Sequence, residues 1–266
     1  MSRRLYLLLL LAAACIYTYK LELSETRTWP ARDVSGITAS SANGHINVAG
    51  SPDTVVTAVV TRRCYGRDRA DAERAIENVL VRDTVQAGEL RLWVEMPGGN
   101  RAYGAYYDIV CPESTRLVLS TTNGSVSLTG TKAGATVSTS NAAIKLLNTR
   151  GQMNLSTTYG EVQVQVHRGG ISVSTTSGNI DCDLAELGAT ETANLTTSNA
   201  KLTLYLPADV SATFDATTSN AEVTVTGFGP VSYEISERWH KRGRLGSGAS
   251  IITLNTSNGD ILIRAR

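Results

Sequence analysis

The chain has 266 residues, of which 42% are hydrophobic and 18% are charged, and its formal net charge is +1. This balance excludes intrinsic disorder, because the chain carries enough apolar residues to form a core. The charge near zero excludes the strongly basic class of nucleic-acid-binding domains, so we expect no nucleic acid as a partner. Phe is scarce, and Thr, Ser, Asn, Val and Gly are common, which is typical of strands and turns.

The N-terminus has the layout of an export signal. Ser2-Arg3-Arg4 form a short basic segment, and the ten residues 5–14 form an apolar run that ends in three alanines. A membrane-spanning helix needs about 20 apolar residues, so this run is too short to cross a bilayer. Cys15 directly follows the alanines, which resembles a bacterial lipobox, although Ala12 stands where that pattern prefers Leu. In a lipobox the cysteine thiol is acylated and the chain is cut just before it.

We therefore predict a lipoprotein-type signal peptide over residues 1–14, lipidation at Cys15 and a tether over residues 15–34. A cleaved soluble protein and an uncleaved short anchor are the two alternatives. All three place the rest of the chain outside the cytoplasm. The lipid would anchor it in the bacterial cell envelope, at the outer membrane or cell surface or facing the periplasm.

Residues 51–112 differ from the rest of the chain. Residues 54–61, 90–95 and 103–110 have the composition of β-strands. Residues 68–80 carry their apolar side chains at helical spacing and form the only convincing helix in the sequence. Because an exposed sheet edge invites aggregation, we expect this helix to cover one end or one edge of the β-structure.

A repeated motif accounts for most of the remaining sequence. Each copy is centred on an anchor residue, and four consecutive anchors, from Asn123 to Ser177, lie 18 residues apart. Tyr159 and Ser177 are the anchors of two copies. The other anchors are asparagines, which are predicted to form a ladder of stacked structural turns: Asn43, Asn123, Asn141, Asn199, Asn220 and Asn258.

Each copy has the same pattern of apolar and polar residues around its anchor. An apolar or small residue lies four positions before it, Ser or Thr lies two before it, and apolar residues lie three and five after it. The spacing of two within each half indicates two strands, each with one buried face. The odd step between the halves requires a turn at the anchor, which Asn followed by Gly suits because both residues tolerate positive φ.

Two architectures explain this pattern: a β-solenoid of stacked coils and a meander of hairpins with two-residue turns. We favour the solenoid, because a fixed period stacks identical residues in columns. In addition, Ala142, Ala200 and Ala221 replace the Gly that a type I′ hairpin turn strongly prefers. The expected fold is all-β, a solenoid-like stack of short two-strand coils with one short helix in an N-terminal excursion. A single domain would span residues 35–266, with the repeats mainly in residues 117–266.

Three cysteines follow Cys15 in the sequence. Cys182 occupies a position that is aliphatic in the other copies, so we predict a buried free thiol that packs in the core. Cys64 and Cys111 both lie in the excursion and are the remaining candidates for a disulfide in an oxidising compartment.

The export signal, a first NGxIxV copy at Asn43, the strand–helix–strand excursion and the serial TxNGxIxV copies together resemble the bacterial putative-adhesin family. This family is also called the toastrack domain of unknown function and is related to the head domains of autotransporter adhesins. The resemblance covers roughly residues 35–266. It implies a solenoid-like β fold at the cell envelope, in some members beside envelope-stress signalling systems, and no defined catalytic motif. Tyr159, Ser177 and Cys111 depart from the family pattern.

The sequence predicts no cofactor, no metal site and no catalytic constellation. His45, His167 and His240 stand apart from one another, and zinc, calcium, nucleotide and serine-hydrolase motifs are absent. The basic segment 237–244 is interpreted as a solvated excursion, with binding of acidic glycan or phospholipid headgroups as the alternative.

We therefore expect a structural or adhesive module rather than an enzyme, which binds an envelope protein or glycan through flat Thr-, Ser- and Asn-rich sheets. The alternative is a regulatory accessory of an envelope-stress or two-component pathway. A polysaccharide-acting β-helix enzyme is the third hypothesis.

Overall fold

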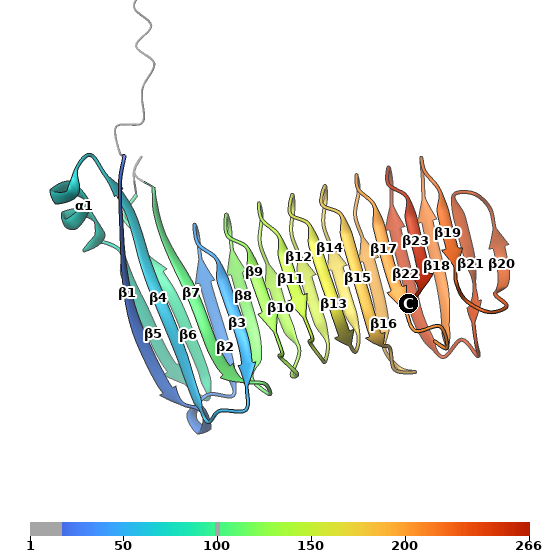
Figure 1. Ribbon diagram of the computed structural model, residues 1–266, viewed down its shortest axis with the longest axis horizontal. Helices are drawn as coiled ribbons and strands as arrows, with labels where there is room; N and C mark the ends of the chain where they lie inside the picture. Colours follow the sequence, from blue (N-terminus) through green and yellow to red (C-terminus); the bar gives the residue numbers. More distant parts are fainter. Residues whose placement is uncertain (1–17, 99–101) are drawn as a thin grey trace, which may run out of the picture.

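The computed structural model describes residues 18–98 and 102–266, which form one elongated stack of β-strands (Figure 1). Two long sheets face each other and enclose the main hydrophobic core. We call the 11-stranded sheet "sheet A" and the 12-stranded sheet "sheet B". Within these described ranges, no helix has the length and hydropathy needed to cross a membrane.

The strands follow one another along the stack as follows, starting at its N-terminal end. Sheet A consists of β1 (Tyr19–Pro30), β4 (Val55–Gly66), β7 (Tyr103–Pro112), β3 (Ile46–Ser51), β9 (Val126–Thr129), β11 (Ile144–Leu147), β13 (Val162–Arg168), β15 (Ile180–Glu186), β17 (Leu202–Leu206), β23 (Ile261–Ala265) and β19 (Val223–Thr226). Sheet B consists of β5 (Leu80–Gln86), β6 (Glu89–Glu95), β2 (Gly36–Ser41), β8 (Arg116–Thr121), β10 (Ala135–Ser138), β12 (Met153–Ser156), β14 (Ile171–Ser174), β16 (Thr192–Thr196), β22 (Ser250–Thr256), β18 (Ala212–Thr218), β21 (His240–Leu245) and β20 (Ser232–Ser236). The 3-10 helix η1 (Ala31–Asp33) follows β1, and the helix α1 (Arg69–Ile76) follows β4.

Each regular coil consists of one strand of sheet B, a corner, and one strand of sheet A. Equivalent strands pair in parallel and in register, so that Val137 lies between Leu119 and Leu155 in sheet B, and Leu146 lies beside Leu128 in sheet A. These side chains are buried, and each contributes roughly 1.5–3 kcal/mol. The two strands of one copy, such as β8 and β9, belong to different sheets. The solenoid is therefore confirmed, and the hairpin meander is excluded.

The corners are held together by the Thr that precedes each anchor by two positions. Its hydroxyl donates to a backbone carbonyl of the neighbouring corner, as Thr139 Oγ1 does to Gly124 O at 3.1 Å. In five coils Gly follows the anchor, and none of these glycines has a positive φ. The prediction that Gly is present there because it tolerates positive φ is therefore wrong. At these five corners Gly instead permits a close approach to the neighbouring corner: a Cβ on Gly160 would lie 1.7 Å from the carbonyl oxygen of Ala142.

The order of the coils departs from the order of the chain near the C-terminal end. β22 pairs with both β16 and β18, and β23 pairs with both β17 and β19. The last coil of the chain is thus inserted between two coils that precede it in sequence. The long gap between the last two anchors contains the hairpin β20–β21, which extends sheet B beyond β18.

The N-terminal end of the stack is more elaborate than expected. Residues 19–30 of the expected tether form β1, which pairs along its whole length with β4, so the folded unit begins before residue 35. The helix α1 ends earlier than expected, and β5 follows it, joined to β6 by a tight turn at Ala87 and Gly88. Ala72 and Ile76 of α1 form a second, smaller cluster with Cys64 of β4, so the helix covers this end of the stack.

The possible disulfide between Cys64 and Cys111 is not formed. In the antiparallel pairing of β4 with β7, Cys64 lies opposite Tyr103, which is eight residues before Cys111. At ~3.3 Å per residue the two cysteines are roughly 26 Å apart, whereas a disulfide needs Cα atoms within roughly 7 Å. Cys182 is a buried free thiol in the main core, as predicted.

Candidate functional site

Asparagine anchors line one long edge of the stack, which we call the corner edge. Asn123 Nδ2 donates to Asn43 Oδ1, and Asn141 Nδ2 donates to Asn123 Oδ1, both at 2.7 Å. The side chains thus form a ladder of amide hydrogen bonds over three coils. Tyr159 and Ser177 interrupt the ladder in the next two coils, and the Tyr159 side chain is exposed there.

A second ladder follows the interruption, and its order reflects the inserted coil. Asn258 Nδ2 donates to Asn199 Oδ1, and Asn220 Nδ2 donates to Asn258 Oδ1, both at 2.8 Å. Asn199 and Asn220 are consecutive anchors in the sequence, but Asn258 lies between them in the stack. Because the amides satisfy one another, the six asparagines act as structural residues of the corners.

The outer face of sheet B carries an array of polar side chains that we call the hydroxyl face. It contains the two outward residues that lie five and three positions before the anchor on five adjacent strands. These residues are Thr136 and Ser138 on β10, Asn154 and Ser156 on β12, Ser172 and Ser174 on β14, Asn194 and Thr196 on β16, and Thr253 and Asn255 on β22. They form two in-register columns with a spacing of about 4.8 Å between strands. None of the ten is charged.

The side chains of the hydroxyl face form no hydrogen bonds with other described residues of the chain. Their hydroxyl and amide groups can both donate and accept, so each remains available to a partner or to water. Charged side chains occur only beyond this array. On one side, Arg116 Nη2 lies 3.2 Å from Glu89 Oε2, and on the other, His240 Nε2 lies 2.9 Å from Asp215 Oδ1.

Sheet A has a different outer surface, with aromatic and charged side chains at its N-terminal end. The Arg63 guanidinium lies between the rings of Tyr65 and Tyr106, at 5.7 and 5.0 Å from their centroids. The Tyr106 ring stacks on His45 at 4.6 Å, and His45 Nε2 lies 3.5 Å from Asp108 Oδ1. These side chains pack against one another's ring faces, so the cluster of Arg63, Tyr65, Tyr106 and His45 stabilises the pairing of β4, β7 and β3.

The open end of the core beside β1 and β5 is closed by polar side chains that point inward. Arg27 of β1 forms an ion pair with Asp83 of β5 and donates to Glu25 at 2.7 Å, and Trp29 Nε1 donates to Asp83 at 3.3 Å. Inward charges at a terminal strand prevent another sheet from stacking on it. The solenoid is therefore ended here rather than left open to a further coil.

The histidines have structural surroundings. His167 is fully buried, with Nδ1 2.9 Å from Thr149 Oγ1 and Nε2 3.3 Å from Gly170 O. Burial lowers its pKa, so it is neutral near pH 7. No group of three or more potential metal ligands occurs in residues 18–98 and 102–266.

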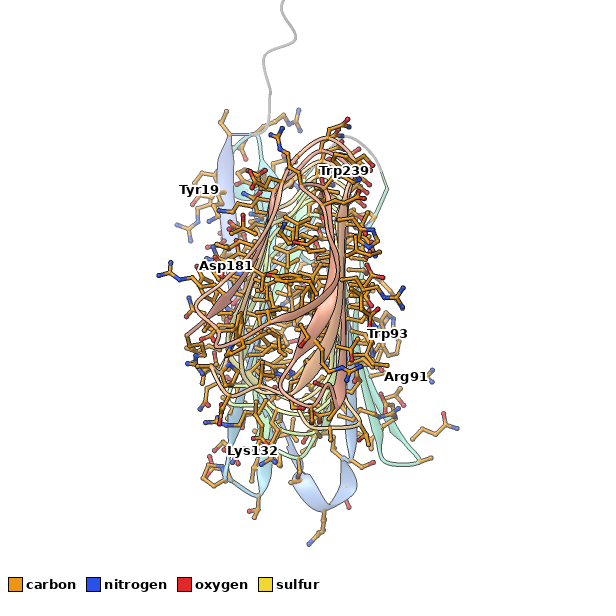
Figure 2. The ribbon with its side chains drawn as sticks, turned by 90° about the vertical axis from the view of Figure 1, so that its right-hand side faces the viewer. Tyr19, Arg91, Trp93, Lys132, Asp181 and Trp239 are labelled. Atoms are coloured by element: carbon orange, nitrogen blue, oxygen red, sulfur yellow. The ribbon has the colours of Figure 1, made fainter. Side chains whose placement is uncertain are left out.

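The predicted lipidation site, Cys15, and the predicted signal peptide lie outside the described residues. The first described strand begins at the corner edge: Figure 2 shows Tyr19 and Trp239 both near the top of the view and Lys132 near the bottom. Trp239 lies at the tip of the β20–β21 hairpin within the basic segment 237–244, and its side chain is 53% exposed. Sequence reasoning missed this placement, because it depends on the antiparallel pairing of β21 with β18, which the repeat pattern does not indicate.

A family model described as Toastrack DUF4097 matches residues 30–264. Three solved structures align with most of the chain at low sequence identity. They are a putative cell adhesion protein of Clostridium sporogenes (12% identity, 92% of this chain and 100% of that chain, TM-score 0.37), a putative adhesin of Bacteroides fragilis (12%, 92% and 97%, TM-score 0.41) and a putative lipid binding protein of Parabacteroides distasonis (13%, 91% and 96%, TM-score 0.35). No protein of curated function matches the sequence.

Proposed function

Because the chain belongs to the Toastrack DUF4097 family, we propose that it is a non-catalytic binding module of the bacterial cell envelope. A lipid on Cys15 anchors it, and the hydroxyl face holds an envelope glycan. The observation that carries this proposal is the set of ten neutral side chains in two in-register columns whose polar groups have no partner in the described chain.

The geometry of the hydroxyl face suits a partner that repeats its own polar groups. A single hydrogen bond contributes only about 0.5–1.5 kcal/mol net, so one hydroxyl cannot retain a ligand. A polymer that lies across several strands forms several such bonds at once, and the later ones form intramolecularly. Since the face is uncharged, binding should change little with salt concentration.

The short segment between Cys15 and β1 supports a defined orientation of the protein at the membrane. Three residues separate Cys15 from Tyr19, and the four residue-to-residue steps between them span at most about 14 Å when fully extended. Tyr19 lies at the corner edge, from which the strands run toward the opposite edge. A lipid on Cys15 therefore brings the corner edge close to the membrane and leaves both sheet faces accessible from the side.

The glycan proposal is tested by placing charge in the centre of the hydroxyl face. The variant Asn154→Glu/Ser172→Glu changes two outward residues and leaves the core intact. Thr129→Glu, an exposed residue of sheet A, is the matched control. Cosedimentation of the purified chain with envelope glycan should fall at least tenfold for the double variant and remain unchanged for the control. The proposal would be refuted if the double variant cosedimented with envelope glycan as well as the wild type does. It would also be refuted if the wild-type chain bound only envelope protein and no glycan.

The lipid anchor is tested separately with Cys15→Ser. This variant should leave the membrane fraction or accumulate as an unprocessed precursor, and it should not incorporate a labelled fatty acid. If it stays membrane-bound, is processed normally and keeps the acyl label, the anchor is not a lipid on Cys15.

A further inference from the structure

A hollow of about 400 Å³ opens on the outer face of sheet A, on the opposite side of the molecule from the hydroxyl face. Its lining includes Asp181 and Asp183 of β15, Gln165 and Val166 of β13, and Tyr205 of β17. Figure 2 shows Asp181 across the molecule from Arg91 and Trp93, which belong to sheet B. The hollow has the volume of a small-molecule site, since such sites commonly measure about 300–1,000 Å³.

The hollow exists because β13 contains a bulge. The pairing of β13 with β15 shifts register between Val164 and His167, so β13 has two residues where β15 has one. Val166 adopts φ 57°, which is rare for a β-branched residue. The bulge residues Gln165 and Val166 line the hollow on the β13 side. Tyr205, which lies directly beside Asp183 on the next strand, lines the other side.

The two carboxylates in the hollow accept no hydrogen bond from the residues that the structure describes. Asp183 Oδ1 is covered from solvent and accepts no hydrogen bond, although Arg266 Nε lies 3.0 Å away in an ion pair. The Asp181 carboxylate accepts no hydrogen bond from any residue that the structure describes. Partial burial, followed by the nearby Glu161 carboxylate, raises the pKa of Asp181, while Lys201 opposes this shift. Asp181 is exposed and Asp183 is paired with Arg266, and both carboxylates keep oxygens that can accept a hydrogen bond from a ligand in the hollow.

We propose that this hollow binds one neutral sugar residue. Vicinal hydroxyls donate to the carboxylates of Asp181 and Asp183, and the Gln165 amide and Arg266 guanidinium donate to sugar oxygens. The apolar face of the sugar ring packs against Tyr205 and Val166. A metal ion fits less well, because the described residues gather fewer than three metal-ligating side chains here. The site is independent of the hydroxyl face, so it is a second binding site beyond the function proposed above.

The experiment uses saturation-transfer NMR and calorimetry on the detergent-solubilised full chain. The probes are glucose, galactose, mannose, N-acetylglucosamine and their β-linked dimers, with putrescine as an amine without a sugar ring. We expect at least one sugar to bind, and Asp181→Asn and Tyr205→Ala to weaken it at least tenfold. The matched controls Asp209→Asn and Tyr159→Ala change an exposed carboxylate and an exposed ring outside the hollow, and they should bind as the wild type does.

Three results would overturn the proposal: no sugar binds, putrescine binds in place of every sugar, or the controls weaken binding as much as the hollow variants. Thermal unfolding of each variant shows whether a loss of binding reflects a loss of fold. Asp181→Asn changes an exposed side chain, so it should melt with the wild type. The Asn154→Glu/Ser172→Glu variant should keep sugar binding in the hollow, which separates the failure of this site from the failure of the hydroxyl face.

Discussion

The asparagine ladder is interrupted at two coils. We predict that placing asparagines there would join its two halves and stabilise the corner edge. Tyr159→Asn and Ser177→Asn place amides in the two coils that separate the first ladder from the second. In the existing rungs, Nδ2 of each Asn donates to Oδ1 of the preceding one at 2.7–2.8 Å. The Tyr159 side chain is 65% exposed, so its removal sacrifices little burial.

The expected magnitudes follow from the number of new hydrogen bonds. Tyr159→Asn alone adds one bond, to Asn141, and Ser177→Asn alone adds one, from Asn199, whose Nδ2 now reaches only Thr176 O at 3.4 Å. The double variant adds a third bond between the two new amides. At about 0.5–1 kcal/mol per partly exposed bond, each single variant should gain about 0.5–1 kcal/mol and the double variant about 1.5–3 kcal/mol.

The decisive quantity is the coupling between the two substitutions. Urea unfolding of the wild type, both single variants and the double variant gives a double-mutant cycle. The coupling energy should be about 0.5–1 kcal/mol in favour of the double variant. Ser114→Asn, at an exposed site outside the ladder, is the control for the substitution itself and should change nothing. A double variant that gains no more than the sum of the single variants would refute the ladder as an energetic unit.

Three further predictions concern the interior of the stack. Cys182→Ser should destabilise the protein by about 1–3 kcal/mol in urea unfolding, because it buries a hydroxyl without a partner, whereas Cys182→Val should cost less than about 1.5 kcal/mol. Burial lowers the pKa of His167 in the folded protein below its ordinary value of 6.5. At a pH just below 6.5, His167 is therefore protonated more often in the unfolded chain than in the folded one. The free energy of unfolding should therefore decrease as the pH falls below about 6.5, and this decrease should be smaller in the His167→Gln variant. Gly160→Ala should cost about 1–3 kcal/mol through its clash with Ala142, whereas Gly98→Ala, with no atom within 4 Å of the added Cβ, should unfold like the wild type.

The repeat pattern predicted the coils correctly because the core imposes one requirement on every copy. Leu119, Val137 and Leu155 lie at the same position relative to their anchors, and they form one buried column in sheet B. A shift of one residue would expose such a column, so the pattern specifies the register strongly. The sequence therefore contained the coil, the position of its corner and the inward face of each strand.

The order of the coils could not be predicted, because every coil presents the same pattern to its neighbours. β16 could pair with β18 as readily as with β22 by that pattern, yet β22 lies between them. The disulfide failed for a related reason. Cys64 and Cys111 belong to one excursion, and each lies near the C-terminal end of its strand. Because β4 and β7 are antiparallel, these two strand ends lie at opposite edges of the sheet.

The outward positions raise a different question, since the core does not determine them. Like charges stacked 4.8 Å apart repel by about 0.9 kcal/mol in water, which favours neutral residues in any column of a solenoid. Repulsion alone does not explain the hydroxyl face, however, because sheet A tolerates charges in its outward columns, with Lys145, Asp181 and Arg264 among them. Both sheets share the same coils and the same strand spacing. The ten neutral, unbonded side chains of sheet B are thus a property that stacking does not require, as expected if that face is kept for a partner.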